Sequence, residues 1–260
     1  MAQPTNTYTP AAGPRIRFEV IGEAWGEFMR NIGTWVVAQL VLLTIVAAIW
    51  FLGFFVVLTP AMLSGDTRAG FIASLFAYFV LLLLILLVSG VFTGGLFRMA
   101  IRQLRGEMPA VGDLFQSFDL APRFIAAQLI IGVLTYVGFF LCIIPGLIFA
   151  GLTFLAYPIL ADQNVGSVGS IRMTWQALNM SWEALKKDWL MAILFFFVLA
   201  IVAEIGSIAC GIGVVFTLPM FFLGIAIVYR DFFPERFAAQ STAPTGAPTP
   251  PAQPPAQPGM

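Results

Sequence analysis

One acidic residue, Glu204, lies inside an apolar stretch that reads FFFVLAIVAEIGSIAC, and the nearest formal charges along the chain are Asp188 and Arg230. Ionisable side chains inside membrane segments are costly and serve a function in most proteins that keep them. Glu204 is therefore a candidate functional acid within the membrane. The alternative interpretation places its carboxylate among the outer lipid head groups, in contact with water.

The two cysteines are expected at comparable places. Cys142 and Cys210 fall where two successive apolar hairpins turn. If that side faces an oxidising compartment, the two thiols can form a disulfide, provided that their Cα atoms come within about 7 Å. Two small, free thiols are the alternative.

Three arginines follow one another at helical spacing in LFRMAIRQLRGE, namely Arg98, Arg102 and Arg105. Such a cluster can bind the head groups of anionic lipids. It can equally act as the ordinary positive anchor that sets the orientation of a membrane helix. Both interpretations place these side chains at a membrane surface.

No set of residues in the sequence matches a catalytic or cofactor site. The chain has no histidine, which removes the commonest general base and metal ligand. It also has neither a phosphate-binding loop nor a G-x-S-x-G motif. The formal net charge is zero, which does not favour a nucleic-acid partner. We therefore expect no cofactor, no metal and no nucleic acid, and we favour a protein that is not an enzyme.

The composition indicates that lipid is the solvent for most of this chain. Hydrophobic residues make up 60% and charged residues only 10% of the 260 residues, with a mean hydropathy of +0.93. Soluble domains carry about 25% charged residues, because their surfaces must be hydrated. The sequence therefore predicts an all-α, polytopic helical bundle in a membrane.

Six apolar segments are long enough to cross a bilayer, which takes about 20 helical residues. The predicted spans are residues 34–58, 71–97, 124–141, 146–160, 190–205 and 212–229. Because residues 146–160 form a short segment, four spans with re-entrant hairpins are the alternative. Gly90 and Gly94 form a G-x-x-x-G pattern in the second span, which favours close approach of another helix.

The positive charges predict the orientation. With a cytoplasmic N-terminus, every Lys and Arg except Arg68 lies on the inner side. This distribution obeys the positive-inside rule, and an even number of spans places both termini in the cytoplasm. The prediction is a multi-pass protein of the bacterial inner membrane, with lipids as its first partners and a second membrane protein or further copies of itself as others.

Amphipathic segments precede the spans. Residues 170–189, SIRMTWQALNMSWEALKKDW, carry a heptad-spaced apolar stripe, which consists of Ile171, Trp175, Leu178, Trp182 and Leu185. Tryptophan favours the head-group zone, so Trp175, Trp182 and Trp189, together with Trp25 in a similar segment at 16–31, are predicted interfacial anchors. We expect the helix of residues 170–189 to lie in the inner leaflet or under the bundle, and a coiled coil with a partner is the alternative.

A third, shorter segment at residues 113–124, DLFQSFDLAPRF, suggests a threefold repeat of amphipathic helix plus hairpin. The repeat units are about 15–105, 110–165 and 168–232, inside a membrane domain of residues 15–236. We expect residues 1–14 and the proline-rich tail at 237–260 to be disordered.

The stretch CIIPGLIFAGLTFLAYPILADQNVGSVGSIRMTWQAL resembles a group of bacterial six-span membrane proteins of unknown function, which is similar to the membrane domain attached to some glycerophosphoryl diester phosphodiesterases. In that family, a turn ending in Pro-Gly, here Pro145 and Gly146, starts a span that leads to an acidic residue, here Asp162. The resemblance extends in layout over residues 19–231. It implies a six-helix inner-membrane module. The sequence does not contain the catalytic phosphodiesterase domain, so that activity is not implied.

Three functional hypotheses follow. The first is a non-enzymatic scaffold or envelope protein that contacts lipid. The second is a small transporter or channel, which would need a polar cavity in the middle of the membrane. The third is an enzyme that modifies lipids, which would need a polar cluster at the inner interface, for which the available side chains are Asp113, Asp119, Asp162 and Arg172.

Overall fold

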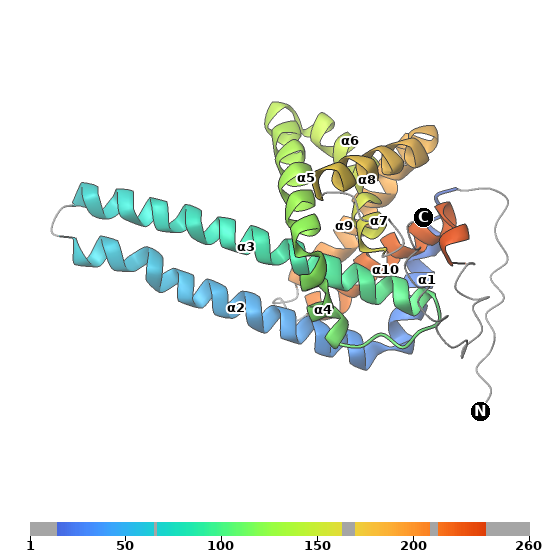
Figure 1. Cartoon of the computed structure of the whole chain (residues 1–260), viewed down its shortest axis with the longest axis horizontal. Coiled ribbons are helices and arrows are strands. Elements are labelled where there is room, and N and C mark those ends of the chain that lie inside the picture. The colour runs from blue at the N-terminus through green and yellow to red at the C-terminus, as the bar shows by residue number, and fades with distance from the viewer. Residues whose placement is uncertain (1–14, 65–66, 163–169, 209–212, 238–260) are drawn as a thin grey trace, which may run out of the picture.

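The computed structural model describes residues 15–64, 67–162, 170–208 and 213–237, and all regular elements in these ranges are helices (Figure 1). Six helices are long and apolar enough to cross a membrane, as predicted. Their bounds are Ile32–Pro60, Thr67–Leu104, Ala121–Leu141, Ile143–Ala161, Ser170–Gly206 and Val214–Phe232. The chain is therefore an all-α, multi-pass membrane protein. Residues 1–14, residues 238–260 of the predicted tail and Cys210 lie outside the described residues.

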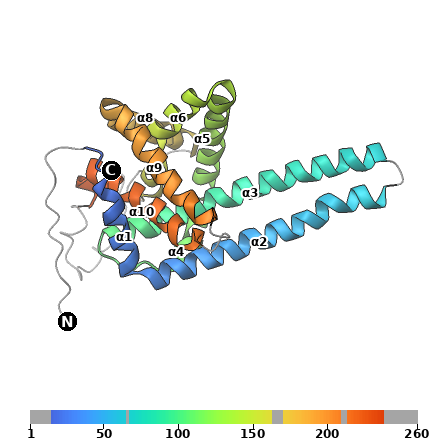
Figure 2. The same cartoon turned by 180° about the vertical axis from the view of Figure 1, so that it is seen from behind.

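The first hairpin is much longer than the other two. Helices α2 (Ile32–Leu63) and α3 (Thr67–Leu104) contain 32 and 38 residues, which correspond to about 48 and 57 Å at 1.5 Å per residue. The hydrocarbon core of a bilayer is about 30 Å thick. Both helices extend beyond the predicted spans, 34–58 and 71–97, mainly at the C-terminal end of each helix. The far half of the hairpin extends away from the rest of the molecule (Figures 1 and 2) and exposes rows of Phe and Leu.

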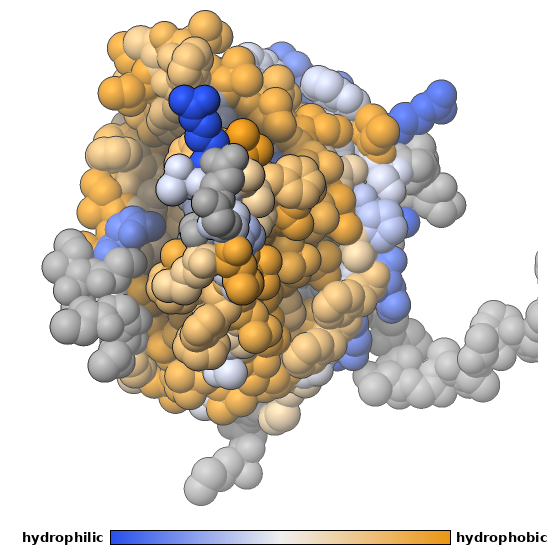
Figure 3. Space-filling view, turned by 90° about the vertical axis from the view of Figure 1, so that its left-hand side faces the viewer, coloured by the Kyte–Doolittle hydropathy of each residue, from blue (hydrophilic) through white to orange (hydrophobic). Residues whose placement is uncertain are grey.

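The other two hairpins pack against each other and against the near half of α3. Helix α5 (Ala121–Leu141) pairs with α6 (Ile143–Thr153), and α9 (Trp189–Ile208) pairs with α10 (Val214–Phe232). A short break separates α6 from α7 (Ala156–Ala161). Seen from the tip of the first hairpin, the surface is mostly hydrophobic (Figure 3), as expected for helices surrounded by lipid.

A short helix precedes each hairpin. These helices are α1 (Glu19–Arg30), α4 (Gly112–Gln116) with the 3-10 turn η1 (Ser117–Leu120), and α8 (Ser170–Leu185) with the 3-10 turn η2 (Lys186–Asp188). The order of elements predicted for the repeat therefore occurs three times. The first hairpin points away from the second (Figures 1 and 2), and the threefold packing of the repeat units stays a prediction.

The faces that these short helices bury differ from the predicted apolar stripes. In α8, Met173, Ala177 and Ser181 are buried with Leu178 and Leu185, whereas Trp175 and Trp182 are 50% and 43% exposed. In α1, Val20, Ala24 and Phe28 are buried and Trp25 is 48% exposed. Small residues allow close helix packing, while the indole rings remain at the edge of each contact. The face of α8 that packs on the bundle is therefore offset from the predicted stripe, of which Leu178 and Leu185 are buried. That Trp25, Trp175 and Trp182 anchor these helices at a membrane interface stays a prediction.

Helix α10 occupies the centre of the fold. It contacts α1, α2, α3, α7 and α9, and most of its residues from Met220 to Tyr229 are buried.

Helix α5 packs on α3 where α3 carries the predicted pair of small residues, Gly90 and Gly94. A Cβ added at Gly94 would lie 2.5 Å from the Phe124 ring, and one at Gly90 would lie 3.1 Å from Gln128. These two glycines therefore permit the close approach of α3 and α5.

Candidate functional site

A set of ion pairs lies at one end of the molecule, where α3 ends and α10 ends. We call this the charged end. Arg102 pairs there with Glu107 at 2.7 Å and with the fully buried carboxylate of Asp113. Arg98 donates a hydrogen bond from Nη1 to the carbonyl of Gln116 at 2.8 Å. These contacts tie the end of α3 to α4, and whether Arg98 or Arg102 also binds lipid stays a prediction.

The third predicted arginine forms a deeper cluster, which we call the Asp162 cluster: Arg105, Asp162, Tyr229 and Arg236. Both carboxylate oxygens of Asp162 lie 3.0 Å from Nη2 of Arg105, and the Tyr229 hydroxyl donates to Oδ2 at 2.8 Å. Arg236 in turn donates to the Tyr229 oxygen at 3.0 Å. The Asp162 side chain is fully buried and that of Arg105 is only 9% exposed. The burial of these groups and their mutual hydrogen bonds favour a structural clamp over a lipid-binding patch, although Nε of Arg105 is buried without a hydrogen-bond partner among the described residues.

The start of the predicted tail also belongs to this end of the bundle. The Arg105 guanidinium lies 5.1 Å from the centre of the Phe237 ring, and that ring contacts Tyr229 at a centroid distance of 5.8 Å. The expectation that the disordered tail begins at residue 237 is therefore corrected, because Phe237 is held against the cluster by a cation–π contact.

Two further polar networks fasten the N-terminal helix to the charged end. Arg17 lies 2.6 Å from Asp231, and Arg230 lies 3.1 Å from Glu23, which joins α1 to the end of α10. The amide of Gln103 accepts a bond from Trp35 Nε1 at 2.7 Å and donates to the Glu27 carbonyl at 2.6 Å. The helices at this end are thus joined by ion pairs and side-chain hydrogen bonds.

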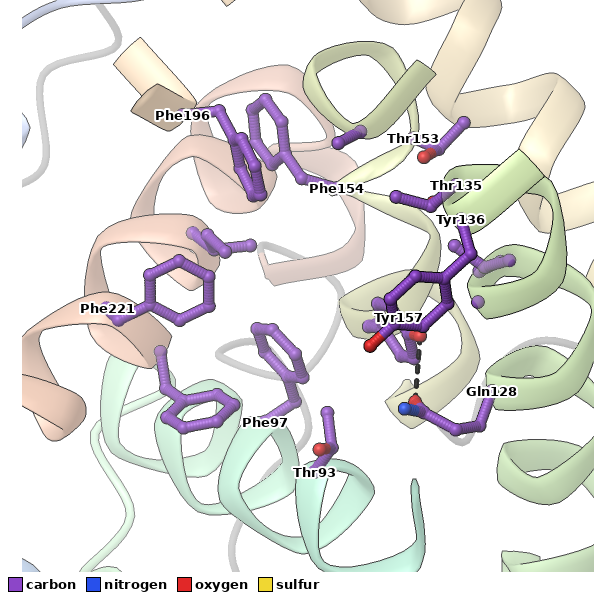
Figure 4. Close-up of a pocket in the computed structure, with 15 residues that line it drawn as sticks. Thr93, Phe97, Gln128, Thr135, Tyr136, Thr153, Phe154, Tyr157, Phe196 and Phe221 are labelled. Atoms are coloured by element: carbon purple, nitrogen blue, oxygen red, sulfur yellow. Dashed lines mark hydrogen bonds between the residues drawn. The ribbon is translucent and has the colours of Figure 1, made fainter. Parts of the chain in front are cut away.

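A cavity of about 320 Å³ lies in the bundle just inside the charged end (Figure 4). We call it the aromatic cavity. Aromatic rings surround it (Figure 4). The aromatic lining residues that the figure labels are Phe97, Tyr136, Phe154, Tyr157, Phe196 and Phe221. The volume falls in the range of about 300–1,000 Å³ that is typical of small-molecule sites. Tyr136, which is 73% exposed, marks the side on which the cavity meets the surroundings of the bundle.

The polar side chains that line this space carry no formal charge, and the structure gives partners to three of them. The Tyr157 hydroxyl donates to Oε1 of Gln128 at 2.9 Å across one wall (Figure 4). The Thr153 hydroxyl donates to the Phe149 carbonyl of its own helix at 2.7 Å. Thr93 and Thr135 also line the cavity. The cavity is therefore a mainly apolar space with a polar pair on one side.

The Asp162 cluster joins helices that also contribute residues to the aromatic cavity, although none of its four residues lines the cavity itself. Arg105 directly follows the helix that carries Phe97, Asp162 directly follows the helix that carries Tyr157, and Tyr229 lies two turns beyond Phe222 on α10. Phe97 stacks on Tyr157 with ring centroids 6.2 Å apart and meets Phe222 edge-on at 5.0 Å. The buried ion pair thus holds together three helices whose aromatic side chains shape the cavity.

The other predicted site residues lie elsewhere. Glu204 is exposed near the far end of α9, so the structure does not place it in the cavity. Cys142, at the turn between α5 and α6, is exposed and its thiol is free. Its predicted disulfide partner, Cys210, lies outside the described residues, and the bridge stays a prediction. Trp189 is 48% exposed at the start of α9.

Sequence reasoning missed the aromatic cavity and half of the Asp162 cluster. Asp162 was recognisable as an acid at the end of a span, and Gln128 as one of few amides in the spans. Tyr157 and Tyr229 carry no local signal, because tyrosine is common near membrane interfaces. In the described ranges, no group of three or more Cys, Asp or Glu side chains is arranged to hold a metal ion.

A scan against protein-family models and searches of curated proteins and of solved structures found no match to this chain. The resemblance to the phosphodiesterase-associated membrane domain therefore stays a prediction.

Proposed function

We propose that this protein is a non-enzymatic, lipid-associated protein of the bacterial inner membrane that holds a hydrocarbon chain in the aromatic cavity. Both termini and the charged end face the cytoplasm in this proposal. The observation that carries it is a partly open, aromatic-walled cavity of about 320 Å³ inside helices that are themselves long enough to span a membrane.

Physical chemistry favours a hydrocarbon as the occupant. An empty cavity loses dispersion contacts on all its walls, at a cost of about 24 cal/mol per Å³ of residual volume in soluble protein cores. Apolar cavities stay dry, because water needs two to four polar partners. Lipid tails surround the helices on every side and fit between aromatic rings. A lipid chain is therefore the occupant that is both available and chemically matched.

The near part of the cavity lies within reach of a chain from the adjacent leaflet. Gln128 lies seven residues inside α5, and Phe196 lies seven residues inside α9, which corresponds to about 10 Å at 1.5 Å per residue. The cavity continues along α5 to Tyr136. A lipid whose head group lies at the charged end extends its chain to this depth, because half of the hydrocarbon core is about 15 Å thick.

The same lining argues against the two alternative functions. A pathway for ions or polar solutes requires charged or polar groups along several spans. Among the described residues, this cavity is lined by no charged residue, and its polar side chains are three threonines, two tyrosines and one glutamine among mainly Phe and aliphatic walls. A lipid-modifying enzyme requires reactive groups that are accessible to substrate. Asp113 and Asp162 are fully buried in pairs with arginine.

The test is photo-cross-linking in vesicles with a phospholipid that carries a diazirine near the end of one chain. Gly132 lines the cavity, and a Cβ added there meets no atom within 4 Å. Gly132→Phe therefore fills the cavity without a backbone clash. The matched control is Val133→Phe, because Val133 is the next residue and is 56% exposed to lipid.

We expect cross-links to peptides from α5 and α10 in the wild type and in Val133→Phe, and their loss in Gly132→Phe. If the α5 and α10 peptides were labelled equally in Gly132→Phe and Val133→Phe, the proposal would be contradicted, because the lipid chain would then bind only to the outer surface of the helices.

A further inference from the structure

A second apolar cavity lies on the other side of α3 and α10. It has a volume of about 190 Å³ and is bounded by α2, α3 and α10, with Leu42, Val46 and Ile49 on the α2 side. We call it the aliphatic cavity. Its Ser89 hydroxyl donates to the Leu86 carbonyl of its own helix at 2.9 Å. That hydroxyl therefore needs no partner in the cavity, and apart from Thr93 the remaining lining is aliphatic or aromatic, which suits a hydrocarbon.

The two cavities share two wall residues. Thr93 of α3 and Phe222 of α10 line both the aromatic and the aliphatic cavity. The Phe222 ring is held in place by edge-on contacts with Phe97 at 5.0 Å and with Phe221 at 5.6 Å, and the residue is only 7% exposed. The cavities are thus neighbours that are separated by a divider about one side chain thick.

The cavities also begin at the same depth. Leu96 lines the aliphatic cavity and Phe97, the next residue of α3, lines the aromatic cavity. Both spaces therefore start at one level below the charged end and lie on opposite sides of one helix–helix contact. Two chains that are joined at a single head group have this arrangement.

We infer that the bound molecule is a two-chain lipid of the phospholipid class, with one chain in the aromatic cavity, the other in the aliphatic cavity, and Thr93 and Phe222 between them. This inference rests on the proposed function, because it names the class of lipid whose first chain fills the aromatic cavity. It also predicts discrimination against lipids that have a single chain.

The test compares the affinities of a diacyl phosphatidylglycerol and its one-chain lyso form, measured by native mass spectrometry of the full-length protein. Val46→Phe fills the aliphatic cavity from α2. The matched control is Val56→Phe, the same substitution on the same helix at a residue that is 59% exposed. Gly132→Phe blocks the aromatic cavity.

For the wild type and Val56→Phe, we expect the diacyl lipid to bind at least about tenfold more tightly than the lyso form, a difference of about 1.4 kcal/mol. In Val46→Phe, this preference should disappear while binding of the lyso form is retained. An unchanged preference in Val46→Phe, together with weakened binding in Gly132→Phe, would overturn the two-chain inference and leave the proposed function standing. If Gly132→Phe changes the affinity for neither lipid, the proposed function would be overturned, and this inference with it.

Discussion

The hydroxyl of Tyr229 donates a hydrogen bond of 2.8 Å to Asp162, whose carboxylate is paired at 3.0 Å with Arg105. These residues come from α10, the end of α7 and the end of α3. Because all three helices contribute walls to the aromatic cavity, this buried contact fixes the geometry of the charged end and of the cavity beside it.

Removal of the Asp162 carboxylate should destabilise the fold strongly. Asp162→Ala leaves the buried Arg105 charge without its partner, and breaking a buried pair in this way costs about 3–5 kcal/mol. Tyr229→Phe removes one hydrogen bond and should cost about 1 kcal/mol. The free energy of unfolding is measured by SDS titration in mixed micelles, with the exposed Asp188→Ala as the control. If Asp162→Ala were as stable as Asp188→Ala, the cluster would not be a clamp.

The contact between α3 and α5 should depend on the absence of a side chain at Gly94. A Cβ at this position lies 2.5 Å from the Phe124 ring, so Gly94→Ala should destabilise the protein by about 1–3 kcal/mol. At Gly33, also within a membrane helix, an added Cβ meets no atom within 4 Å. Gly33→Ala should therefore be neutral or slightly stabilising. The same SDS titration checks both variants, and equal effects would contradict the observed packing.

Docking of α8 should depend on its small residues. Ser181 donates a buried hydrogen bond of 2.8 Å to the Leu152 carbonyl, and Ala177 is 1% exposed on the same face. Ala177→Leu overpacks this contact and should cost about 1–3 kcal/mol, whereas Gln176→Leu, on an exposed neighbour, should not. Protection of α8 amides in hydrogen exchange reports the docking directly. Loss of protection in Gln176→Leu but not in Ala177→Leu would reverse the assignment of the faces.

Orientation in the membrane can be read from the exposed thiol of Cys142. With the charged end in the cytoplasm, the turn between α5 and α6 faces outward. In a Cys210→Ser background, a membrane-impermeant maleimide should label Cys142 in intact spheroplasts. Labelling that requires lysis would place the charged end outside and contradict the positive-inside prediction. In the wild type, labelling that rises after reduction would support the Cys142–Cys210 bridge.

The sequence predicted the helices well because crossing a membrane imposes a simple requirement, about 20 apolar residues without charge. All six spans occur at the predicted places, and α2 and α3 extend beyond theirs. The excess length of the first hairpin was not predictable, because the polar residues that flank a span can continue its helix or form a loop.

The packing faces were harder to predict for a physical reason. Lipid tails are as apolar as a protein core, so hydrophobicity does not distinguish a face that meets lipid from one that meets another helix. In α8 this led to a tryptophan stripe as the predicted apolar face, whereas Met173, Ala177 and Ser181 make the contact. Likewise, Asp162 was recognisable as an unusual acid, but its pairing with Tyr229 bridges 67 positions in the chain and depends on the tertiary fold.

A cryo-electron microscopy map of the protein in lipid nanodiscs would test occupation of the aromatic cavity most directly. We expect elongated, chain-like density between the rings of Phe97, Tyr157 and Phe196, reaching toward the charged end. A collapsed cavity, or one that holds separate water peaks around Tyr157 and Gln128, would contradict lipid binding.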